Sequence, residues 1–447
     1  MKLRNYQVEA SDIAIKFFEE SSMKKALQVL ATGAGKSLCI GEIANRLKDK
    51  VLCIQSSKEL LEQNYNKFIS YGQEASIYSA SFGKKEHGNV TFATIGSIVK
   101  KGEEFRKQGY KYILLDEAHT FKAGNGMWGN FLKTSKIQKV LGLTATPFKM
   151  ETLGGQFDSY SRLKMITNRG LHYPMFEDII YLQQIQEIIK LGFWSKIEYE
   201  VFDIDTGDLV FNSTGADFTE ESINKFYKTQ GLEKKIINRI MDSEGQAILV
   251  FVPSIQDAQS LAAKVPNSAC VYSGMPSKER DRIIDEYRSG KIRTVFNVNI
   301  LSIGFDYPEI DHIIDAKPKG NLGKIYQALG RCVRIHPNKE KAIVTDFSGN
   351  INRYGQIEDI FFKKSMNKWQ VYGSDNRLLS DIAIKYIRPW KHEGEWNVYI
   401  NFGKYFGKRV SDLPDNVLID MFKNTNWDSS NMHIREAILE IKKQRVK

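Results

Sequence analysis

The heptapeptide Ala31-Thr32-Gly33-Ala34-Gly35-Lys36-Ser37 joins a short apolar run at 27–30 to a helical segment at 38–44. Its glycines let successive backbone N–H groups turn toward one anion, and the N-terminus of the following helix adds partial positive charge. We therefore expect a phosphate-binding loop, with Lys36 at the β- and γ-phosphates and the Ser37 hydroxyl on Mg²⁺. A leucine stands where the usual pattern begins with glycine, so an ordinary turn remains the alternative.

Length and composition limit what surrounds this loop. A chain of 447 residues exceeds one ordinary hydrophobic core, so we expect two or three domains. No apolar run reaches the ~18 residues of a membrane span, and the N-terminus lacks a signal-peptide core. We expect a cytoplasmic protein without membrane contact, in a bacterium or a phage-infected host. The net charge of +11 favours a polyanionic partner such as nucleic acid.

The cysteines exclude two kinds of structural site. The chain has four of them, at 39, 53, 270 and 332, and none shows C-x-x-C spacing. We therefore expect neither a zinc site nor a disulfide framework. The phosphate-binding loop instead predicts ATP and Mg²⁺ as cofactors.

Short apolar strands alternate with helical segments in two series, which predicts an α/β fold with doubly wound parallel sheets. The strands of the first series are expected at 51–54, 90–95, 112–115 and 139–143, and those of the second at 247–252, 269–272, 293–298, 312–315 and 341–346. The predicted organisation is a first lobe at 1–170, a connection at 171–196 with a helix over 181–191, a second lobe at 197–350, a linker at 351–390 and a small α+β module at 391–447.

Two adjacent carboxylates follow the predicted strand at 112–115. Asp116 is placed to hold Mg²⁺, and Glu117 to polarise a water molecule that attacks the γ-phosphate. His119 completes the sequence Asp-Glu-Ala-His. The alternative for this tetrapeptide is a solvated turn, but its position after a buried strand and downstream of a phosphate loop favours catalysis.

Two further clusters match the needs of ATP hydrolysis. Gln327, Arg331 and Arg334 are spaced i, i+4 and i+7, so on a helix they share one face that suits a γ-phosphate; a solvated basic helix is the alternative. Arg4 and Gln7 open a predicted helix ahead of the phosphate loop and can hydrogen-bond an adenine edge, or they simply start a surface helix.

Together these residues resemble the helicases of superfamily 2, over about residues 1–350. The motifs occur in the family's order: Q motif (3–7), motif I (31–37), motif II (116–119), motif III (144–146), motif V (Gly304 and Asp306) and motif VI (327–334). The resemblance implies two RecA-like lobes that bind ATP in the cleft between them, with Arg331 and Arg334 reaching the γ-phosphate from the second lobe. Gly304 and Asp306 would face the ribose or the Mg²⁺ shell.

The resemblance also implies roles outside the phosphate loop. Coupling of hydrolysis to movement would fall to His119, Thr144, Thr146 and Gln327. Contacts to the DNA backbone would fall to Ser57, Lys58, Thr94 and Ser97 in the first lobe and to Pro253 and Ser254 in the second. Such contacts are mostly to phosphate and sugar, so little sequence specificity is expected.

Within the superfamily, residues 30–37, 141–148 and 304–308 are most similar to RadD-type repair helicases and to phage branch-migration helicases of the UvsW kind. RadD-like proteins carry a cysteine-rich C-terminal zinc region, which this chain lacks. We expect a monomeric, ATP-dependent DNA helicase that unwinds or branch-migrates forks and Holliday junctions, together with replication or recombination proteins. The alternatives are a double-strand translocase or motor subunit without unwinding, and an RNA helicase.

Two segments are candidates for additional DNA contacts. Residues 199–211 flank a turn at 205–208 and form either a strand-separating hairpin or an edge of the second lobe. In the C-terminal module, aromatic residues alternate with basic residues, among them Lys404 and Lys408, so the segment can stack bases and hold phosphates. The alternative is that its aromatic rings form a small hydrophobic core.

Overall fold

The computed structural model describes residues 3–121, 126–154, 160–170, 174–202, 204–301, 307–387, 405, 410, 413–427, 434–435, 438–439 and 441–442. The chain folds into two compact units and passes between them three times. Unit 1 consists of Met1–Lys149 and Met165–Phe193, and unit 2 of Met150–Lys164 and Trp194–Lys447. Among the described residues, no helix combines the length and apolar character needed to cross a membrane.

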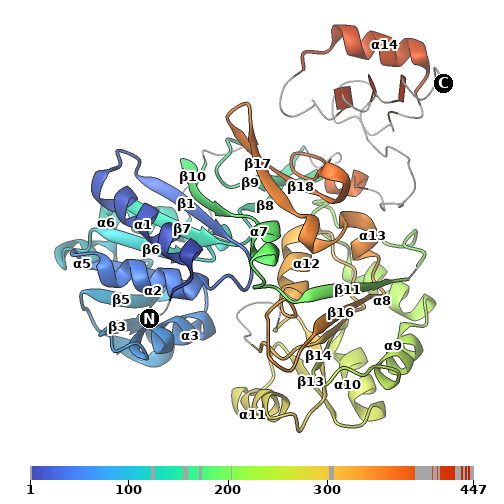
Figure 1. The fold of residues 1–447 in the computed structure, drawn as a ribbon, viewed down its shortest axis with the longest axis horizontal. Coiled ribbons are helices and arrows are strands. Elements are labelled where there is room, and N and C mark those ends of the chain that lie inside the picture. Colours follow the sequence, from blue (N-terminus) through green and yellow to red (C-terminus); the bar gives the residue numbers. More distant parts are fainter. Residues whose placement is uncertain are drawn as a thin grey trace. The chain divides into compact units, whose positions relative to one another are not determined.

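Unit 1 is built on an eight-stranded sheet of order β10-β1-β7-β6-β2-β5-β3-β4, in which only the β3–β4 pair is antiparallel (Figure 1). Its strands are β1 (Lys25–Leu30), β2 (Val51–Gln55), β3 (Ser76–Ser79), β4 (Lys84–Lys85), β5 (Val90–Thr94), β6 (Tyr112–Asp116), β7 (Lys139–Thr144) and β10 (Asp178–Gln183). Its helices are α1 (Asn5–Glu20), α2 (Lys36–Arg46), α3 (Lys58–Ile69), α4 (Ile95–Ile98), α5 (Gly102–Lys107), α6 (Met127–Ser135) and α7 (Ile185–Lys190), with 3₁₀ turns η1 (Ala80–Phe82) and η2 (Ala118–Thr120).

The central strands of unit 1 are mostly apolar and are buried along almost their whole length, because helices cover both faces of the sheet. Every residue of β2 is buried, as are all but the first residues of β1 and β7. Such continuous apolar runs are typical of parallel strands between two helix layers. Helices α1, α2 and α3 pack side by side, and α5 packs against α6.

Unit 2 contains a second, fully parallel sheet of order β11-β16-β15-β12-β14-β13. Its strands are β11 (Lys196–Val201), β12 (Ile248–Phe251), β13 (Ser268–Tyr272), β14 (Thr294–Val298), β15 (His312–Asp315) and β16 (Lys341–Asp346). Its helices are α8 (Glu220–Thr229), α9 (Leu232–Met241), α10 (Ile255–Lys264), α11 (Ser277–Arg288), α12 (Leu322–Leu329), α13 (Asn350–Tyr354) and α14 (Asp415–Asn424). Together the two sheets confirm the predicted fold class.

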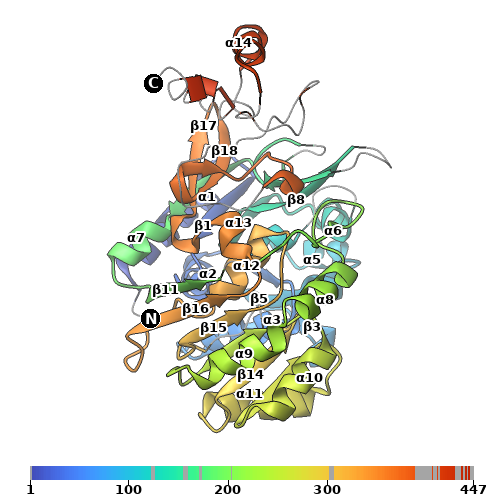
Figure 2. The same ribbon diagram turned by 90° about the vertical axis from the view of Figure 1, so that its right-hand side faces the viewer.

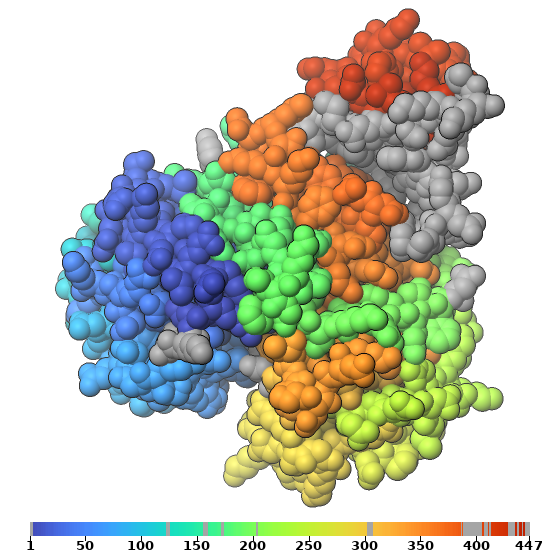
Figure 3. Space-filling model, viewed as in Figure 1, coloured from blue at the N-terminus to red at the C-terminus, as the bar shows by residue number. Residues whose placement is uncertain are grey.

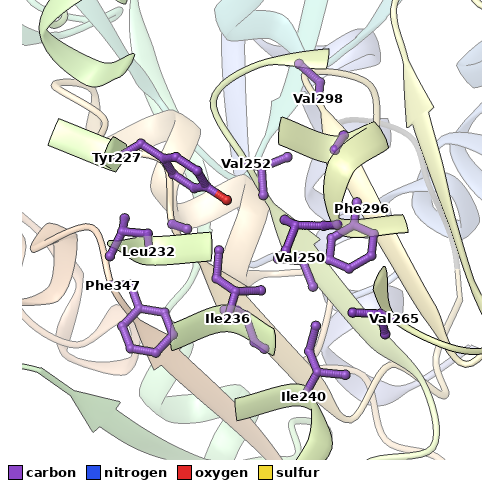
Figure 4. Packing of buried hydrophobic residues seen from close by; sticks show 14 of the residues in the cluster. Tyr227, Leu232, Ile236, Ile240, Val250, Val252, Val265, Phe296, Val298 and Phe347 are labelled. Atoms are coloured by element: carbon purple, nitrogen blue, oxygen red, sulfur yellow. The ribbon is translucent and has the colours of Figure 1, made fainter. Parts of the chain in front are cut away.

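The core of unit 2 lies between this sheet and the helices on one side of it. In Figure 2, α9 and α10 run along the strands. Figure 4 shows Ile236 and Ile240 of α9 beside Val250 of β12, and Phe296 of β14 belongs to the same cluster. A smaller cluster in the C-terminal module joins Leu418 and Met421 of α14 to Ile434, Ile438 and Ile441.

Unit 2 also contains two smaller sheets. One is the pair β8 (Phe148–Leu153) and β9 (Tyr160–Met165), which starts and ends at the unit boundaries. The other is a three-stranded sheet of β17 (Phe361–Ser365), β18 (Lys368–Gly373) and β19 (Arg377–Leu378), flanked by the 3₁₀ turns η3 (Ile357–Asp359), η4 (Ser374–Asn376) and η5 (Ile384–Tyr386).

Several sequence-based boundaries differ from the structure. The helix expected over 181–191 is wrong, because residues 178–183 form β10 at the edge of the unit 1 sheet and only α7 is helical. Alternate residues of β10 are buried, which is a strand period. The segments expected as a connection and a linker thus contain β10 and the β17–β18–β19 sheet. Residues 199–201 belong to β11, which is an edge strand of the unit 2 sheet. For these residues the structure agrees with the second alternative, an edge of the second lobe, and not with a strand-separating hairpin.

Gly142 in β7 provides a test of how tightly the interior of unit 1 is packed. A Cβ at this position would lie 2.5 Å from Phe176 Cζ and 2.8 Å from Ala118 Cβ, which is too close for carbon atoms. We expect Gly142→Ala to lower the free energy of unfolding by about 1–3 kcal/mol, measured by urea denaturation. The control is Gly96→Ala in α4, where no atom lies within 4 Å of the added Cβ. Equal stabilities of the two variants would contradict this packing.

Candidate nucleotide-binding site

The phosphate loop has the backbone conformation that an anion cradle requires. Gly33 and Gly35 have φ of 78° and 83°, in the left-handed region that side chains disfavour. The Ala34 N–H donates to the Ala31 carbonyl over 3.0 Å, which closes the turn. Helix α2 begins at Lys36 directly after Gly35, so the first N–H groups of the helix face the loop.

Helix α1 supports this loop through the Ala34 carbonyl. The Tyr6 hydroxyl donates to it over 2.9 Å and the Gln7 side-chain amide over 2.8 Å. The other atom of the Gln7 amide, Oε1, accepts from the Arg4 backbone N–H over 2.9 Å. A side chain at Gly35 would collide with the Gln7 amide. Gln7 therefore packs directly beneath the loop, which the sequence did not indicate.

Arg4 has a different environment. Its guanidinium carbon lies 3.5 Å from the centre of the Phe193 ring, and its Nη1 donates to the Tyr6 hydroxyl over 3.1 Å. The stacked guanidinium keeps a planar hydrogen-bonding edge. Recognition of adenine by Arg4 and Gln7 remains a prediction.

The two carboxylates of the Asp-Glu-Ala-His sequence lie at the end of β6, where the sequence predicted them. Asp116 is the last residue of β6 and is buried. Its Oδ2 accepts from Asn64 Nδ2 over 2.7 Å, and its Oδ1 accepts from the Glu117 N–H over 2.9 Å. Burial and the neighbouring Glu117 charge raise the pKa of Asp116 to about 6, so the carboxylate is still ionised at neutral pH.

Glu117 adopts a left-handed backbone with φ of 45°, a conformation that is uncommon outside glycine. This turn sends its carboxylate back toward the phosphate loop, where Glu117 Oε1 lies 3.6 Å from Lys36 Nζ. Both side chains are largely shielded, with exposed fractions of 16% and 14%. The ion pair thus joins the general-base candidate to the lysine of the loop.

His119 extends this arrangement to the end of β7. Its Nδ1 lies 2.8 Å from Thr144 Oγ1 and 3.0 Å from Thr146 Oγ1, and 3.5 Å from Glu117 Oε2. Burial lowers the pKa of His119, so the imidazole is neutral at physiological pH. Lys36, Glu117, His119 and the two threonines therefore lie in one row within unit 1, with each side chain within 3.6 Å of the next.

These residues suit a Mg²⁺–nucleotide complex. The loop offers backbone N–H groups and one lysine for phosphates, and the Ser37 hydroxyl and Asp116 would hold Mg²⁺ together with phosphate oxygens. In the part of the chain that the structure describes, no three His, Cys, Asp or Glu side chains gather as a metal cage. A magnesium ion held by one or two protein ligands and by phosphate needs no such cage.

Three of the four DNA-contact candidates of unit 1, Lys58, Thr94 and Ser97, lie around η1. The Ser97 hydroxyl accepts from the Ala80 N–H over 2.9 Å and lies 2.9 Å from Thr94 Oγ1. Lys58 Nζ lies 5.2 Å from the centre of the Phe82 ring. Ser57 caps α3 by accepting from the Leu60 N–H, a structural use of its hydroxyl. Because β2, β5 and β3 are neighbouring strands, these residues share one edge of the sheet.

In unit 2 the predicted helical face for the arginines is wrong. Helix α12 ends at Leu329, so Gln327 lies on the helix while Arg331 and Arg334 follow it in a turn. Arg331 is 8% exposed and its Nε donates to the Gln327 carbonyl over 3.1 Å. Gly330 is the C-cap of α12 and keeps a right-handed backbone, with φ of −61° and ψ of −2°.

The segment that carries the two arginines is nevertheless held in place by the surrounding fold. Lys339 Nζ donates to the Cys332 carbonyl over 3.0 Å, and Ser195 Oγ donates to the Arg334 carbonyl over 2.8 Å. Burial lowers the pKa of Lys339 to about 8. Of the remaining candidates, Ser254 caps α10 after Pro253, by accepting from Asp257 N over 3.1 Å. Gly304, Asp306, Lys404 and Lys408 lie outside the described residues.

Sequence reasoning missed two supporting residues, Asn64 and Lys339. Asn64 occupies a position in the apolar stripe of α3, between the buried residues Leu60 and Phe68. A polar residue at helical spacing within such a stripe indicates a buried hydrogen bond, and that signal was present in the sequence. Lys339 follows a loop, where no periodic pattern identifies a buried cation.

Asn64 gives a test of the magnesium assignment. Asn64→Ala removes the side-chain donor that orients Asp116, so we expect the apparent Mg²⁺ affinity in ATP hydrolysis to fall by roughly 10- to 100-fold. The measurement is a Mg²⁺ titration at saturating ATP. Asn66→Ala, an exposed change on the same helix, serves as the control. An unchanged Mg²⁺ dependence would show that Asn64 does not position the metal ligand.

Comparison with known proteins agrees with this geometry. Residues 1–149 match the model "Type III restriction enzyme, res subunit", and residues 231–336 match "Helicase conserved C-terminal domain". The chain is 22% identical over 373 residues to the putative ATP-dependent helicase IRC3 of Saccharomyces cerevisiae, covering 78% of this chain and 51% of that protein. It is 22% identical over 371 residues to the DNA 3'-5' translocase XPB2 of Sulfurisphaera tokodaii, covering 75% and 79%.

Among solved structures, a fragment of a putative HsdR subunit of a type I restriction enzyme from Vibrio vulnificus shares the fold, with a TM-score of 0.59 and 18% identity. That match covers 78% of this chain and 64% of the fragment. The chain spans about half the length of the yeast relative. The two domain models, in the order of the two units, and the relatives identify the chain as a member of helicase superfamily 2.

Proposed function

We propose that this chain is an ATP-driven DNA motor that unwinds or branch-migrates forked and Holliday-type DNA. The observation that carries the proposal is the network from Lys36 through Glu117 and His119 to Thr144 and Thr146. Because it leads from the phosphate loop through Glu117 to the end of β7, it supports the roles of Lys36 in phosphate binding, of Glu117 as general base and of the threonines in coupling. A static phosphate-binding protein would need only the first of these.

The ion pair between Lys36 and Glu117 explains how substrate would activate the base. The triphosphate of ATP carries several negative charges, so it competes with Glu117 for the lysine. Once the lysine binds phosphate, the Glu117 carboxylate is released to orient the attacking water. When Glu117 moves, His119 beside it shifts as well, and this shift displaces the two threonines that contact His119 at the end of β7.

The nature of the polymer rests on several supports. The net charge of +11 suits a polyanion, and one relative is described as a DNA 3'-5' translocase. The similarity of residues 30–37, 141–148 and 304–308 to RadD-type and UvsW-type helicases favours branched DNA. We propose that the protein acts in the cytoplasm as a monomer, with replication or recombination proteins as partners.

A double-strand translocase is the second candidate, because the Sulfurisphaera relative is described as a DNA 3'-5' translocase. The two functions separate in one experiment on forked, flapped, four-way and blunt duplex DNA. ATP-dependent strand separation on the branched substrates supports the helicase. ATP hydrolysis with displacement of a third strand from a triplex, but without strand separation, supports the translocase. Stronger stimulation of ATP hydrolysis by RNA than by a matched DNA would refute both.

The catalytic assignment is tested by paired variants. Glu117→Gln keeps the size of the side chain but removes its basicity, so we expect kcat to fall roughly 10²- to 10⁴-fold with ATP and DNA binding retained. Lys36→Ala should weaken ATP binding itself, measured with a fluorescent nucleotide. Hydrolysis by Glu117→Gln at close to the wild-type rate would remove Glu117 from this role.

The arginines of unit 2 are tested in the same assays. Arg334→Ala should leave ATP affinity within a few-fold of wild type and lower turnover by roughly 10³- to 10⁵-fold, because an arginine finger acts on the transition state. Arg331→Ala should add a binding defect. Arg282→Ala on α11 is the control. Normal hydrolysis by both arginine variants would exclude them from the ATP site.

A further inference from the structure

The hairpin of β17 and β18 combines features that the motor site does not use. Met366 and Asn367 connect the strands, and their φ values of 46° and 60° are both positive. Two successive positive φ values define a type I′ turn, which joins twisted strands tightly. The hairpin projects from the surface of unit 2, as its orange segment shows in Figures 1 and 3.

The tip of this hairpin is basic and carries an exposed apolar side chain. Residues 361–373 contain Lys363, Lys364 and Lys368 but no Asp or Glu. Met366 is 60% exposed at the end of the turn. Lys363 and Lys368 are exposed and form no ion pair with any residue that the structure describes, while Lys364 lies 5.8 Å from the centre of the Trp369 ring.

The base of the hairpin, in contrast, is fixed to unit 2. Phe362 and Val371 form a buried cross-strand pair, and the rings of Phe361 and Tyr372 stack at 5.1 Å with an interplanar angle of 11°. Below them, Ser374 Oγ donates to an Asp359 carboxylate oxygen. A rigid base with an exposed tip transmits any movement of unit 2 to the end of the hairpin.

Protection of a sheet edge is the simpler explanation for part of this composition. Strand β17 is the edge of its sheet, and lysines on edge strands prevent pairing with other chains. That explanation accounts for Lys363 and Lys364. It also covers Lys368, because β19 pairs with β18 at Tyr372 and Gly373, away from Lys368. It does not account for an apolar side chain exposed at the turn.

We propose that this hairpin contacts DNA at the junction between duplex and single strands, and that Met366 inserts against the terminal base pair. The inference rests on the proposed function and names the contact that separates the strands. Apolar side chains such as methionine act as wedges between base steps in proteins that deform DNA. Lys363 of β17 and Lys368 of β18 share one face of the hairpin and hold phosphates beside the junction.

Two double variants test the apolar tip and the phosphate contacts of the hairpin one at a time. M366N/N367G replaces the turn by Asn-Gly, the sequence that type I′ turns favour most, so the hairpin is retained without its apolar tip. K363Q/K368Q removes two charges and keeps both side chains polar. The control K234Q/K235Q removes two exposed lysines from α9.

The test uses forked DNA with 2-aminopurine at the first base pair of the duplex, without nucleotide, so that it does not depend on a working motor. The wild type should raise the fluorescence because the base is unstacked, and M366N/N367G should bind the fork within about threefold but lose that rise. K363Q/K368Q should reduce the slope of log K against log salt by about 1.8, at ~0.9 for each phosphate released. The control should match the wild type in both measurements.

The outcomes decide the proposal separately from the motor function. No fluorescence rise with the wild type, an undiminished rise with M366N/N367G, or an unchanged salt slope with K363Q/K368Q would each overturn it. A wild type whose ATP hydrolysis DNA does not stimulate would instead refute the proposed function. In that case the fluorescence rise and its loss in M366N/N367G would still establish the hairpin as the junction contact.

Discussion

The parallel pairing of β7 with both β1 and β6 is the constraint on which the nucleotide site depends. Register pairs Val29 with Thr144 on one side, and Asp116 with Leu143 on the other. Three strands therefore end at the same edge of the sheet, and each continues into a different part of the site. The end of β1 gives the phosphate loop, β6 gives the carboxylates, and β7 gives the threonine hydroxyls.

This edge concentrates groups whose burial is unfavourable unless they are paired. Asp116 has a raised pKa and depends on Asn64 and on the Glu117 N–H, while Glu117 depends on Lys36 and its uncommon backbone conformation. Such groups would lower stability in a protein with no use for them. Their presence together is the physical reason to regard the site as functional.

Much of this site followed from sequence because its chemistry is local. The loop at 31–37 and the carboxylates at 116–117 each follow an apolar strand directly. Such a pattern can be recognised in the sequence without knowledge of the fold. Residues 181–183 were misassigned as the start of a helix because a short apolar run fits either period, and the pairing of β10 with β1 shows that they form a strand. The helix expected through Arg334 ends at Leu329, since the backbone of 332–334 is bound instead by Lys339 and Ser195. Ser195 is distant in the sequence and Lys339 follows a loop, so no local sequence pattern identifies these partners.

The most direct test of the account is a crystal structure with Mg²⁺ and a non-hydrolysable ATP analogue. The account predicts that the β- and γ-phosphates occupy the loop at 31–37, with Mg²⁺ beside Ser37 and Asp116. Lys36 Nζ, now 3.6 Å from Glu117 Oε1, should then contact phosphate, and Glu117 should face a water molecule at the γ-phosphate. A nucleotide bound elsewhere, or a Lys36–Glu117 ion pair that persists with nucleotide in the loop, would contradict it.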